Sequence, residues 1–218
     1  MPSRLIALDA DGVLLDYGAA YAGAWAQTFG AHPVLRNADA YWPIDRWDVG
    51  RLRGKELERF RASFDEQFWS GIPPIVGALE ACNELVGQGY ELICVTAVAS
   101  QFRLARLANL RTFGFPLSDV IVVDDQASLH SPKAEVIRTL NPVAFVDDYL
   151  PYHRGLPGHV HKALITRESY GSPNVGPELS IVDSQHKNLK EFARSWVMQA
   201  TYEDGSTDED SGRLRFAP

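Results

Sequence analysis

Two pairs of carboxylates are the residues of this chain that could most directly do chemistry. Asp9 and Asp11 follow one short apolar run, and Asp147 and Asp148 follow another. Such runs are typical of strands in parallel sheets covered by helices, and ligands bind beyond the carboxyl ends of those strands. Two acidic clusters at one sheet edge would repel each other without a cation, and hard divalent cations prefer oxygen ligands. The pairs therefore predict a Mg²⁺ site with a carboxylate free to react.

The spacing of Asp9 and Asp11 suits a nucleophile and an acid–base group. Side chains two residues apart on an extended segment point to the same side, so one carboxylate could attack phosphorus while the other transfers protons. The alternative is an Asp-Gly turn that only ends a strand. A calcium-binding loop fits less well, because it needs glycine at its sixth position and Gly12 is the fourth residue counted from Asp9.

Thr96 and Lys133 are candidate phosphate ligands. Thr96 ends an apolar run, where a hydroxyl and the following N–H group can hold a phosphate oxygen, although threonine is also a common strand former. Lys133 lies in the first turn of a predicted helix, where the helix dipole disfavours a cation by roughly 0.3–1 kcal/mol. Nearby carboxylates or a bound phosphate would offset that cost, and the alternative is a solvated lysine.

A further Asp-Asp pair, Asp124 and Asp125, also follows an apolar run, so such a pair is not specific by itself. The order of residues separates the two pairs. A helix that begins near Lys133 leads into the later pair, and no lysine lies between Thr96 and Asp124. We therefore assign the metal to the later pair and expect the earlier one to be a turn or rim feature.

Apolar runs and helical periodicity predict an α/β fold. The expected strands are 5–9, 91–96, 120–124, 143–147 and 160–166, and the expected helices are 74–88, 101–113, 132–140 and 185–198. Ser131 is the expected N-cap of the third of these helices, with Pro132 at its first position. Strands that alternate with helices imply a parallel, Rossmann-like sheet flanked by helices.

Residues 17–71 interrupt this alternation. They hold four of the five tryptophans and a helical stretch at 52–68. We expect a small helical domain here, inserted into an α/β core formed by residues 1–16 and 72–200. The acidic, polar segment 201–218 is predicted to be disordered.

Composition excludes several classes of function. The 218-residue chain is 45% hydrophobic and 22% charged, as in ordinary globular proteins, and its net charge of −7 does not indicate nucleic-acid binding. Two cysteines favour a reducing compartment. The first apolar run is too short for a signal peptide or a membrane span. We expect a cytoplasmic protein whose partner is a small phosphorylated metabolite, not a nucleic-acid polymer or a membrane.

The order of the motifs resembles that of the haloacid dehalogenase superfamily of phosphohydrolases. Asp-Ala-Asp-Gly at 9–12, Thr96, Lys133 and the Asp-Asp pair at 147–148 cover residues 4–148, about two-thirds of the chain. The resemblance implies the α/β core of that family. It also implies that residues 17–71 are a cap, because family members carry a mobile cap after the first strand.

The resemblance implies a role for each candidate residue. Asp9 would be the nucleophile and Asp11 the acid–base group, while Thr96 and Lys133 would hold the phosphoryl group. The second aspartate also argues against carbon–halogen cleavage, because the dehalogenases of the family lack it.

The implied Mg²⁺ ligands are Asp148, Asp9 and the backbone carbonyl of Asp11, with Asp147 assisting. Many family members carry a further acid about four residues after the metal aspartate. Tyr152 occupies that position in this chain. How Asp147 and Asp148 divide their roles therefore stays open.

Residues 17–71 also suggest a substrate. Their aromatic and cationic side chains could stack a nucleobase and grip a phosphate, or could form the core and the solvated face of the insertion. These residues are Tyr21, Trp25, Tyr41, Trp42, Trp47, Trp69, Arg46, Arg51, Arg53 and Lys55. Residues 72–81 are similar to a segment of deoxyribonucleotidases, which makes a nucleoside monophosphate the leading candidate. The alternatives are a sugar or organic-acid phosphate, a phosphoacceptor module and a catalytically silent binding protein.

Overall fold

The centre of the molecule is a parallel β-sheet. The computed structural model describes residues 4–124 and 131–209, with side chains through residue 200. In this part of the chain the sheet has six strands in the order β3-β2-β1-β4-β5-β6, and every neighbouring pair is parallel. The strands are β1 (Leu5–Leu8), β2 (Glu91–Ala97), β3 (Val120–Val123), β4 (Ala144–Asp147), β5 (His161–Ile165) and β6 (Ser184–His186). The predicted parallel α/β fold is confirmed.

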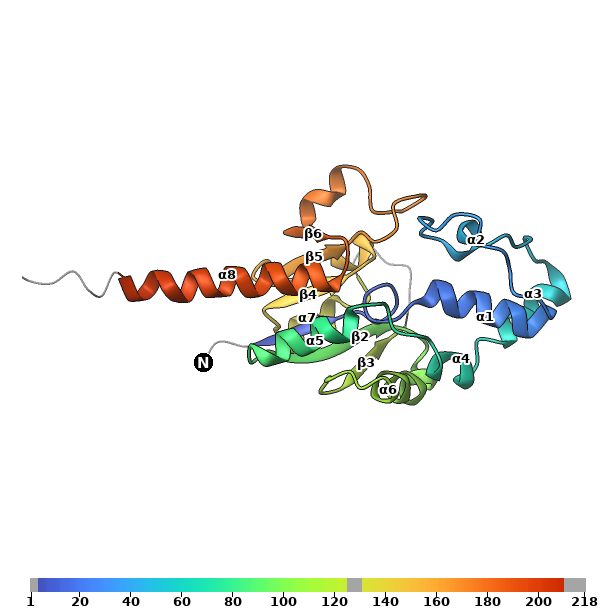
Figure 1. Ribbon diagram of the computed structural model, residues 1–218, viewed down its shortest axis with the longest axis horizontal. Coiled ribbons are helices and arrows are strands. Elements are labelled where there is room, and N and C mark those ends of the chain that lie inside the picture. Colours follow the sequence, from blue (N-terminus) through green and yellow to red (C-terminus); the bar gives the residue numbers. More distant parts are fainter. Residues whose placement is uncertain (1–3, 125–130, 210–218) are drawn as a thin grey trace, which may run out of the picture.

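Helices cover both faces of the sheet (Figure 1). Alternate residues of β1 point to opposite faces, so Ile6 and Leu8 enter one buried cluster and Ala7 enters the other. The larger cluster contains buried residues of α5 (Ala78–Gly87), α6 (Arg103–Thr112) and α8 (Leu189–Glu209), and the smaller one contains Ile137 of α7 (Ala134–Leu140). Short 3₁₀ helices occupy Ser100–Phe102, Leu150–His153 and Pro177–Ile181.

Two predicted boundaries near the C-terminus are wrong. The segment 184–186 is the edge strand β6, so the last helix begins at Leu189 and not at residue 185. The three residues of β6 carry no apolar alternation, so only pairing with β5 reveals the strand. Helix α8 then continues through Glu209, into the segment 201–218 that was expected to be disordered, while 210–218 lie outside the described residues. No proline interrupts this segment, and each added helical residue adds one hydrogen bond.

Helix α7 begins later than predicted. Its N-cap is Lys133 and not Ser131. The Ser131 carbonyl accepts a hydrogen bond from the N–H of Ala134 at 3.0 Å, and its hydroxyl oxygen accepts one from the N–H of Lys133 at 3.1 Å. Because of this turn, the helix begins at Ala134 and Lys133 is its N-cap.

Residues 17–71 form the helical insertion, which lies beyond the carboxyl ends of the strands (Figure 1). Its helices are α1 (Tyr17–Phe29), α2 (Pro43–Arg46), α3 (Gly54–Ala62) and α4 (Glu66–Ser70). The stretch predicted as one helix at 52–68 is two helices, because Asp65 caps α4 by accepting a hydrogen bond from the N–H of Phe68 at 3.0 Å. Phe60 and Phe64, 5.0 Å apart between ring centroids, belong to an aromatic cluster that holds the insertion together.

Both cysteines, Cys82 and Cys94, are buried and carry free thiols. None of the described helices combines the length and the apolar character that crossing a membrane requires.

Replacing Phe192 by alanine tests whether the first turns of α8 belong to the core. Phe192 is 1% exposed and stacks on Trp196 with ring centroids 5.6 Å apart. We expect the free energy of unfolding to fall by about 3–5 kcal/mol, because the change leaves a cavity. Val76→Ala is the control: this side chain is 98% exposed, and its loss should change the free energy by no more than ~0.5 kcal/mol. Urea denaturation measures both, and equal effects would contradict the core position of Phe192.

Candidate active site

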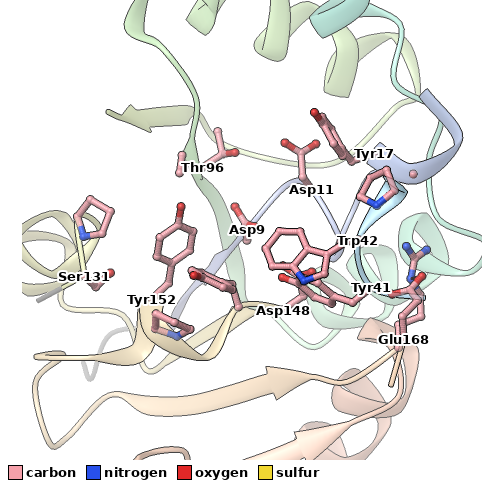
Figure 2. A pocket seen from close by; sticks show the side chains of 18 of the residues that line it. Asp9, Asp11, Tyr17, Tyr41, Trp42, Thr96, Ser131, Asp148, Tyr152 and Glu168 are labelled. Atoms are coloured by element: carbon pink, nitrogen blue, oxygen red, sulfur yellow. Dashed lines mark ion pairs between the residues drawn. The ribbon is translucent and has the colours of Figure 1, made fainter. Parts of the chain in front are cut away.

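Sheet register brings the predicted residues to one edge. Leu8 of β1 pairs with Cys94 of β2 and with Val146 of β4. The strands therefore end side by side, and Asp9, Thr96 and the Asp-Asp pair follow within two residues. Asp9, Asp11, Thr96 and Asp148 line a cavity of about 710 Å³ between the sheet edge and the helical insertion (Figure 2).

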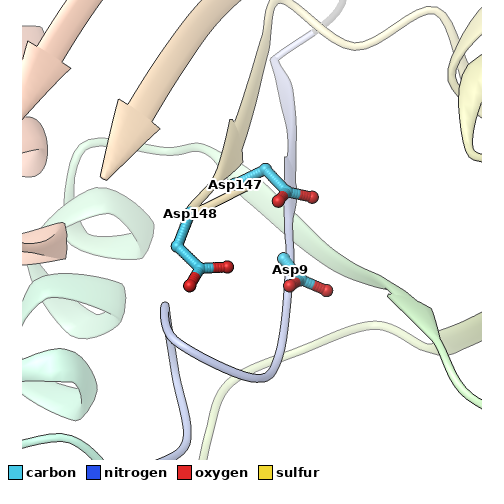
Figure 3. A group of neighbouring side chains, drawn as sticks. All are labelled: Asp9, Asp147 and Asp148. Atoms are coloured by element: carbon cyan, nitrogen blue, oxygen red, sulfur yellow. The ribbon is translucent and has the colours of Figure 1, made fainter. Parts of the chain in front are cut away.

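Three carboxylates crowd together at this edge (Figure 3). Asp9, Asp147 and Asp148 each place an oxygen within 4.8 Å of the others. Burial raises the pKa of Asp9 to about 6, with Lys133 opposing the rise and Asp147 adding to it. Burial also raises the pKa of Asp148 well above its usual range, and the charges of Asp147 and Asp9 raise it further. Ionised carboxylates this close and this buried are unfavourable without a cation.

Lys133 supplies one such cation from inside the protein. Its side chain is fully buried, and its ammonium lies 2.6 Å from Asp9 Oδ1 and 2.6 Å from Asp147 Oδ2. Although desolvation disfavours the charged amine, these two carboxylates raise the pKa of Lys133 above its usual value. The centroid of the Tyr152 ring lies 4.6 Å from the ammonium. Lys133 therefore remains charged, but it does not itself line the cavity.

Asp147 and Asp148 have different surroundings. Both oxygens of Asp147 are engaged, one by Lys133 and the other by the N–H of Tyr149 at 2.9 Å. Asp148 lines the cavity and forms no ion pair with any residue the structure describes. Its backbone carbonyl accepts a hydrogen bond from the side chain of Asn174 at 2.7 Å. Of the two, Asp148 is the carboxylate that a ligand in the cavity can reach.

Gly12 allows the first loop to pass directly against Asp148. Its φ of +84° is a left-handed conformation, and a Cβ atom at this position would overlap the Asp148 carboxylate. Glycine is the residue that tolerates both conditions. Together with the oxygen donors of Asp9 and Asp148, this close approach makes a compact acidic cradle that fits a hard divalent cation.

Arg106 is a site residue that the sequence did not reveal. It lies on α6, is fully buried, and donates a hydrogen bond from Nη2 to Asp11 Oδ2 at 2.7 Å. Its guanidinium lies 5.1 Å from the centroid of the Trp69 ring. Arg106 shares the buried side of α6 with Asn109 and Leu110. A cationic residue on the buried face of a predicted helix was the pattern in the sequence that could have indicated it.

The helical insertion contributes part of the cavity wall, although fewer of its side chains than expected. Of the aromatic and cationic residues considered in the sequence, those that line the cavity are Tyr41, Trp42, Trp69 and Arg46. Tyr21 and Trp25 instead pack on Phe60, with ring centroids 5.0 and 5.4 Å apart. These two rings form the internal core of the insertion.

The loop after β5 connects the core to the insertion on the far side of the cavity. The N–H of Tyr41 donates to the Tyr170 carbonyl at 3.0 Å, and the N–H of Tyr170 donates to the Asp39 carbonyl at 2.9 Å. Glu168 accepts from Arg46 at 3.1 Å. These contacts close one side of the cavity (Figure 2).

The earlier acidic pair stays apart from this arrangement. Asp124 is exposed and is not on the cavity wall, and Asp125 lies outside the described residues. The described member of the pair therefore adds nothing to the acidic cluster.

Comparison with solved structures finds similar folds at low sequence identity. A HAD-family hydrolase from Deinococcus radiodurans R1, determined with bound phosphate and sodium, has a TM-score of 0.60 and 14% identity, over 92% of this chain and 97% of that one. A predicted phosphoglycolate phosphatase from Haemophilus somnus 129pt has a TM-score of 0.58 and 16% identity, over 88% and 97%. The L-2-haloacid dehalogenase of Xanthobacter autotrophicus has a TM-score of 0.53 and 17% identity, over 88% and 97%. No protein-family model and no curated protein matches the sequence.

Replacing Gly12 by alanine tests the acidic cradle. The new Cβ must displace Asp148, and the left-handed backbone alone costs roughly 1–2 kcal/mol, so we expect at least that loss in the free energy of unfolding. Added Mg²⁺ should stabilise the variant less than the wild type. Gly23→Ala is the matched control, because nothing lies within 4 Å of a Cβ at that helical position, and it should stabilise by about 0.4–1 kcal/mol. Denaturation with and without Mg²⁺ measures both, and equal changes would contradict the contact between Gly12 and Asp148.

Proposed function

We propose that this chain, which has the fold of the haloacid dehalogenase superfamily, is a Mg²⁺-dependent phosphatase that hydrolyses a small phosphate monoester. The observation that carries the proposal is the position of Asp9 and Asp11 on one cavity wall, each with its own buried cation. Thr96 and Asp148 line the same cavity. This combination offers a nucleophile, a proton-transfer group and oxygen ligands within one enclosed space.

In this proposal Asp9, Asp148 and the backbone carbonyl of Asp11 hold Mg²⁺. When bound, the ion neutralises the crowded carboxylates and the charge of the substrate phosphate. Asp147 serves the site indirectly, because Lys133 and the N–H of Tyr149 already occupy its oxygens. Asp147 thereby fixes Lys133 beside the nucleophile.

The proposed reaction has two displacements at phosphorus. The Asp9 carboxylate attacks phosphorus, the bond to the ester oxygen breaks, and protonated Asp11 gives its proton to the departing oxygen. A water molecule then attacks the aspartyl-phosphate, its proton passes to Asp11, and the bond between phosphorus and Asp9 breaks to release phosphate. The Thr96 hydroxyl stabilises the negative charge of each transition state from the cavity wall, and the Lys133 ammonium does so from its position beside Asp9.

Carbon–halogen cleavage is the competing reaction, since a solved dehalogenase has a similar fold. A halide ion leaves without a proton, whereas an alkoxide leaving group needs one. Asp11, which lines the cavity and is held by Arg106, provides that proton transfer. The acid–base residue therefore favours phosphate ester hydrolysis.

The walls of the cavity favour a nucleoside monophosphate as substrate. Trp42 is 43% exposed and lines the cavity, where its ring packs edge-to-face on Tyr41 and its exposed part can stack on a base. Glu168 partly neutralises Arg46 and Arg167 at 3.1 and 2.6 Å. A planar, uncharged leaving group suits this wall better than a second anionic group. Sugar and organic-acid phosphates are the alternatives.

Replacing Asp9 by asparagine tests the proposed nucleophile. We expect phosphate release from 4-nitrophenyl phosphate to fall at least ~10³-fold, since the covalent step is lost, and EDTA should abolish wild-type activity. Asp124→Asn is the matched control, because this aspartate also follows a strand but is exposed and off the cavity wall.

The control should keep activity within about twofold, as is usual for exposed positions. Phosphate release by Asp9→Asn at the wild-type rate would overturn the mechanism. Release of halide from a 2-haloacid, without phosphate release from any ester, would replace phosphatase by dehalogenase.

Replacing Trp42 by alanine tests the substrate. Loss of base stacking should raise KM for nucleoside monophosphates by roughly 5–150-fold, the equivalent of about 1–3 kcal/mol. Ribose 5-phosphate, which lacks a base, is the matched substrate control and should show little change. Equal losses for both substrates would contradict base recognition and favour the sugar or organic-acid alternative.

A further inference from the structure

Arg106 is a buried cation whose contacts point to a single carboxylate. Its side chain is fully buried and does not line the cavity, so it does not reach a ligand there. Its one ion pair among the described residues is with Asp11, at 2.7 Å. Nε and Nη1 are buried and have no hydrogen-bond partner in the same part of the chain. Asp11 is therefore the hydrogen-bond and ion-pair partner of the guanidinium among the described residues.

The surroundings of Arg106 hold it in place. Trp69 of α4 lies against one face of the guanidinium, 5.1 Å from ring centroid to Cζ, and the Trp69 indole donates to the Phe64 carbonyl at 3.1 Å. Trp69 also stacks on Tyr17 of α1, with centroids 6.2 Å apart. A buried guanidinium with a single polar partner is costly, and general packing does not require a charge here.

We propose that Arg106 is a positioning residue that fixes the Asp11 carboxylate in the orientation for proton transfer to the leaving group. This inference rests on the phosphatase function proposed above. Arg106 holds Oδ2 of Asp11, which lines the cavity, without lining the cavity itself. Because arginine stays protonated, it does not compete for the proton that Asp11 carries.

The physical basis is the precision that proton transfer requires. A carboxylate without a fixed partner rotates about its terminal torsion, which has only a broad preference. The bond from Arg106 restrains that rotation, and Trp69 restrains Arg106. Misplacing a reacting group by about 1 Å can cost on the order of 100-fold in rate, so losing the restraint should slow the step in which the ester bond breaks.

Arg106→Met tests the proposal with two esters that need proton donation to different degrees. Phenyl phosphate has a poor leaving group and 4-nitrophenyl phosphate a good one. We expect kcat/KM for phenyl phosphate to fall on the order of 100-fold. The loss for 4-nitrophenyl phosphate should be at least ~10 times smaller than that, because its good leaving group needs less proton donation. The readout is the ratio of the two kcat/KM values in one preparation, so a lower folded fraction cancels.

Arg103→Met is the matched control on the same helix. Arg103 is partly exposed and forms an ion pair with Asp119 at 2.7 Å. Neither residue lines the cavity. The ratio for this variant should equal that of the wild type. Arg106→Lys should recover part of the lost selectivity, because lysine keeps the charge but not the planar guanidinium.

A double-mutant cycle asks whether Arg106 acts through Asp11. Adding Arg106→Met to Asp11→Asn should leave the ratio unchanged from that of Asp11→Asn alone, because the group it positions is gone. An unchanged ratio in the single variant Arg106→Met, or a further change in the double variant, would overturn the proposal. If the wild type hydrolyses neither ester nor any phosphorylated metabolite, the proposed phosphatase function itself has failed.

Discussion

The ammonium group of Lys133 lies between two buried carboxylates, 2.6 Å from Asp9 and 2.6 Å from Asp147. These residues come from the ends of two neighbouring strands and from the start of α7, so one cation ties three elements at the sheet edge. Removing Lys133 would leave both buried carboxylates without their cation, and breaking a buried pair in this way typically costs about 3–5 kcal/mol. The rest of the candidate site is arranged around this triad. Asp148 is left facing the cavity because Lys133 already occupies Asp147.

The site contains a second buried pair with a different purpose. Arg106 and Asp11 meet at 2.7 Å, and the arginine is enclosed by Trp69 of the helical insertion. The two aspartates of the first loop therefore have separate cations, a lysine for Asp9 and an arginine for Asp11. This separation lets two neighbouring carboxylates differ in surroundings, which is the usual basis for assigning them different chemical roles.

The helical insertion and the loop after β5 together complete one side of the cavity. The backbone hydrogen bonds of Tyr170 with Tyr41 and Asp39, and the ion pair of Arg46 with Glu168, join them. Asp9, Asp11 and Asp148 line the cavity at the sheet edge, and the insertion adds aromatic rings and Arg46, whose charge Glu168 compensates. In the proposed function the carboxylates would hold the cation and the phosphate, and the aromatic wall would hold an uncharged planar group.

Local patterns in the sequence were enough to predict the parallel sheet and the edge at which Asp9, Asp11, Thr96 and Asp148 meet. Each depends on a local pattern: an apolar run makes a buried strand, and a polar residue directly after it lies at the strand end. Strand β6 was not predicted because Ser-Gln-His has no apolar alternation.

Which cation neutralises which acid follows from the packing of distant elements and not from any local pattern. Arg106 is 95 residues from Asp11, and nothing local to either residue encodes their contact. The same holds for Asn174 and Asp148, which lie 26 residues apart. It also holds for the insertion, where Trp42 lines the cavity and Trp25 packs inside the insertion. Strand position follows from short-range periodicity, whereas charge pairing depends on how distant helices and loops pack.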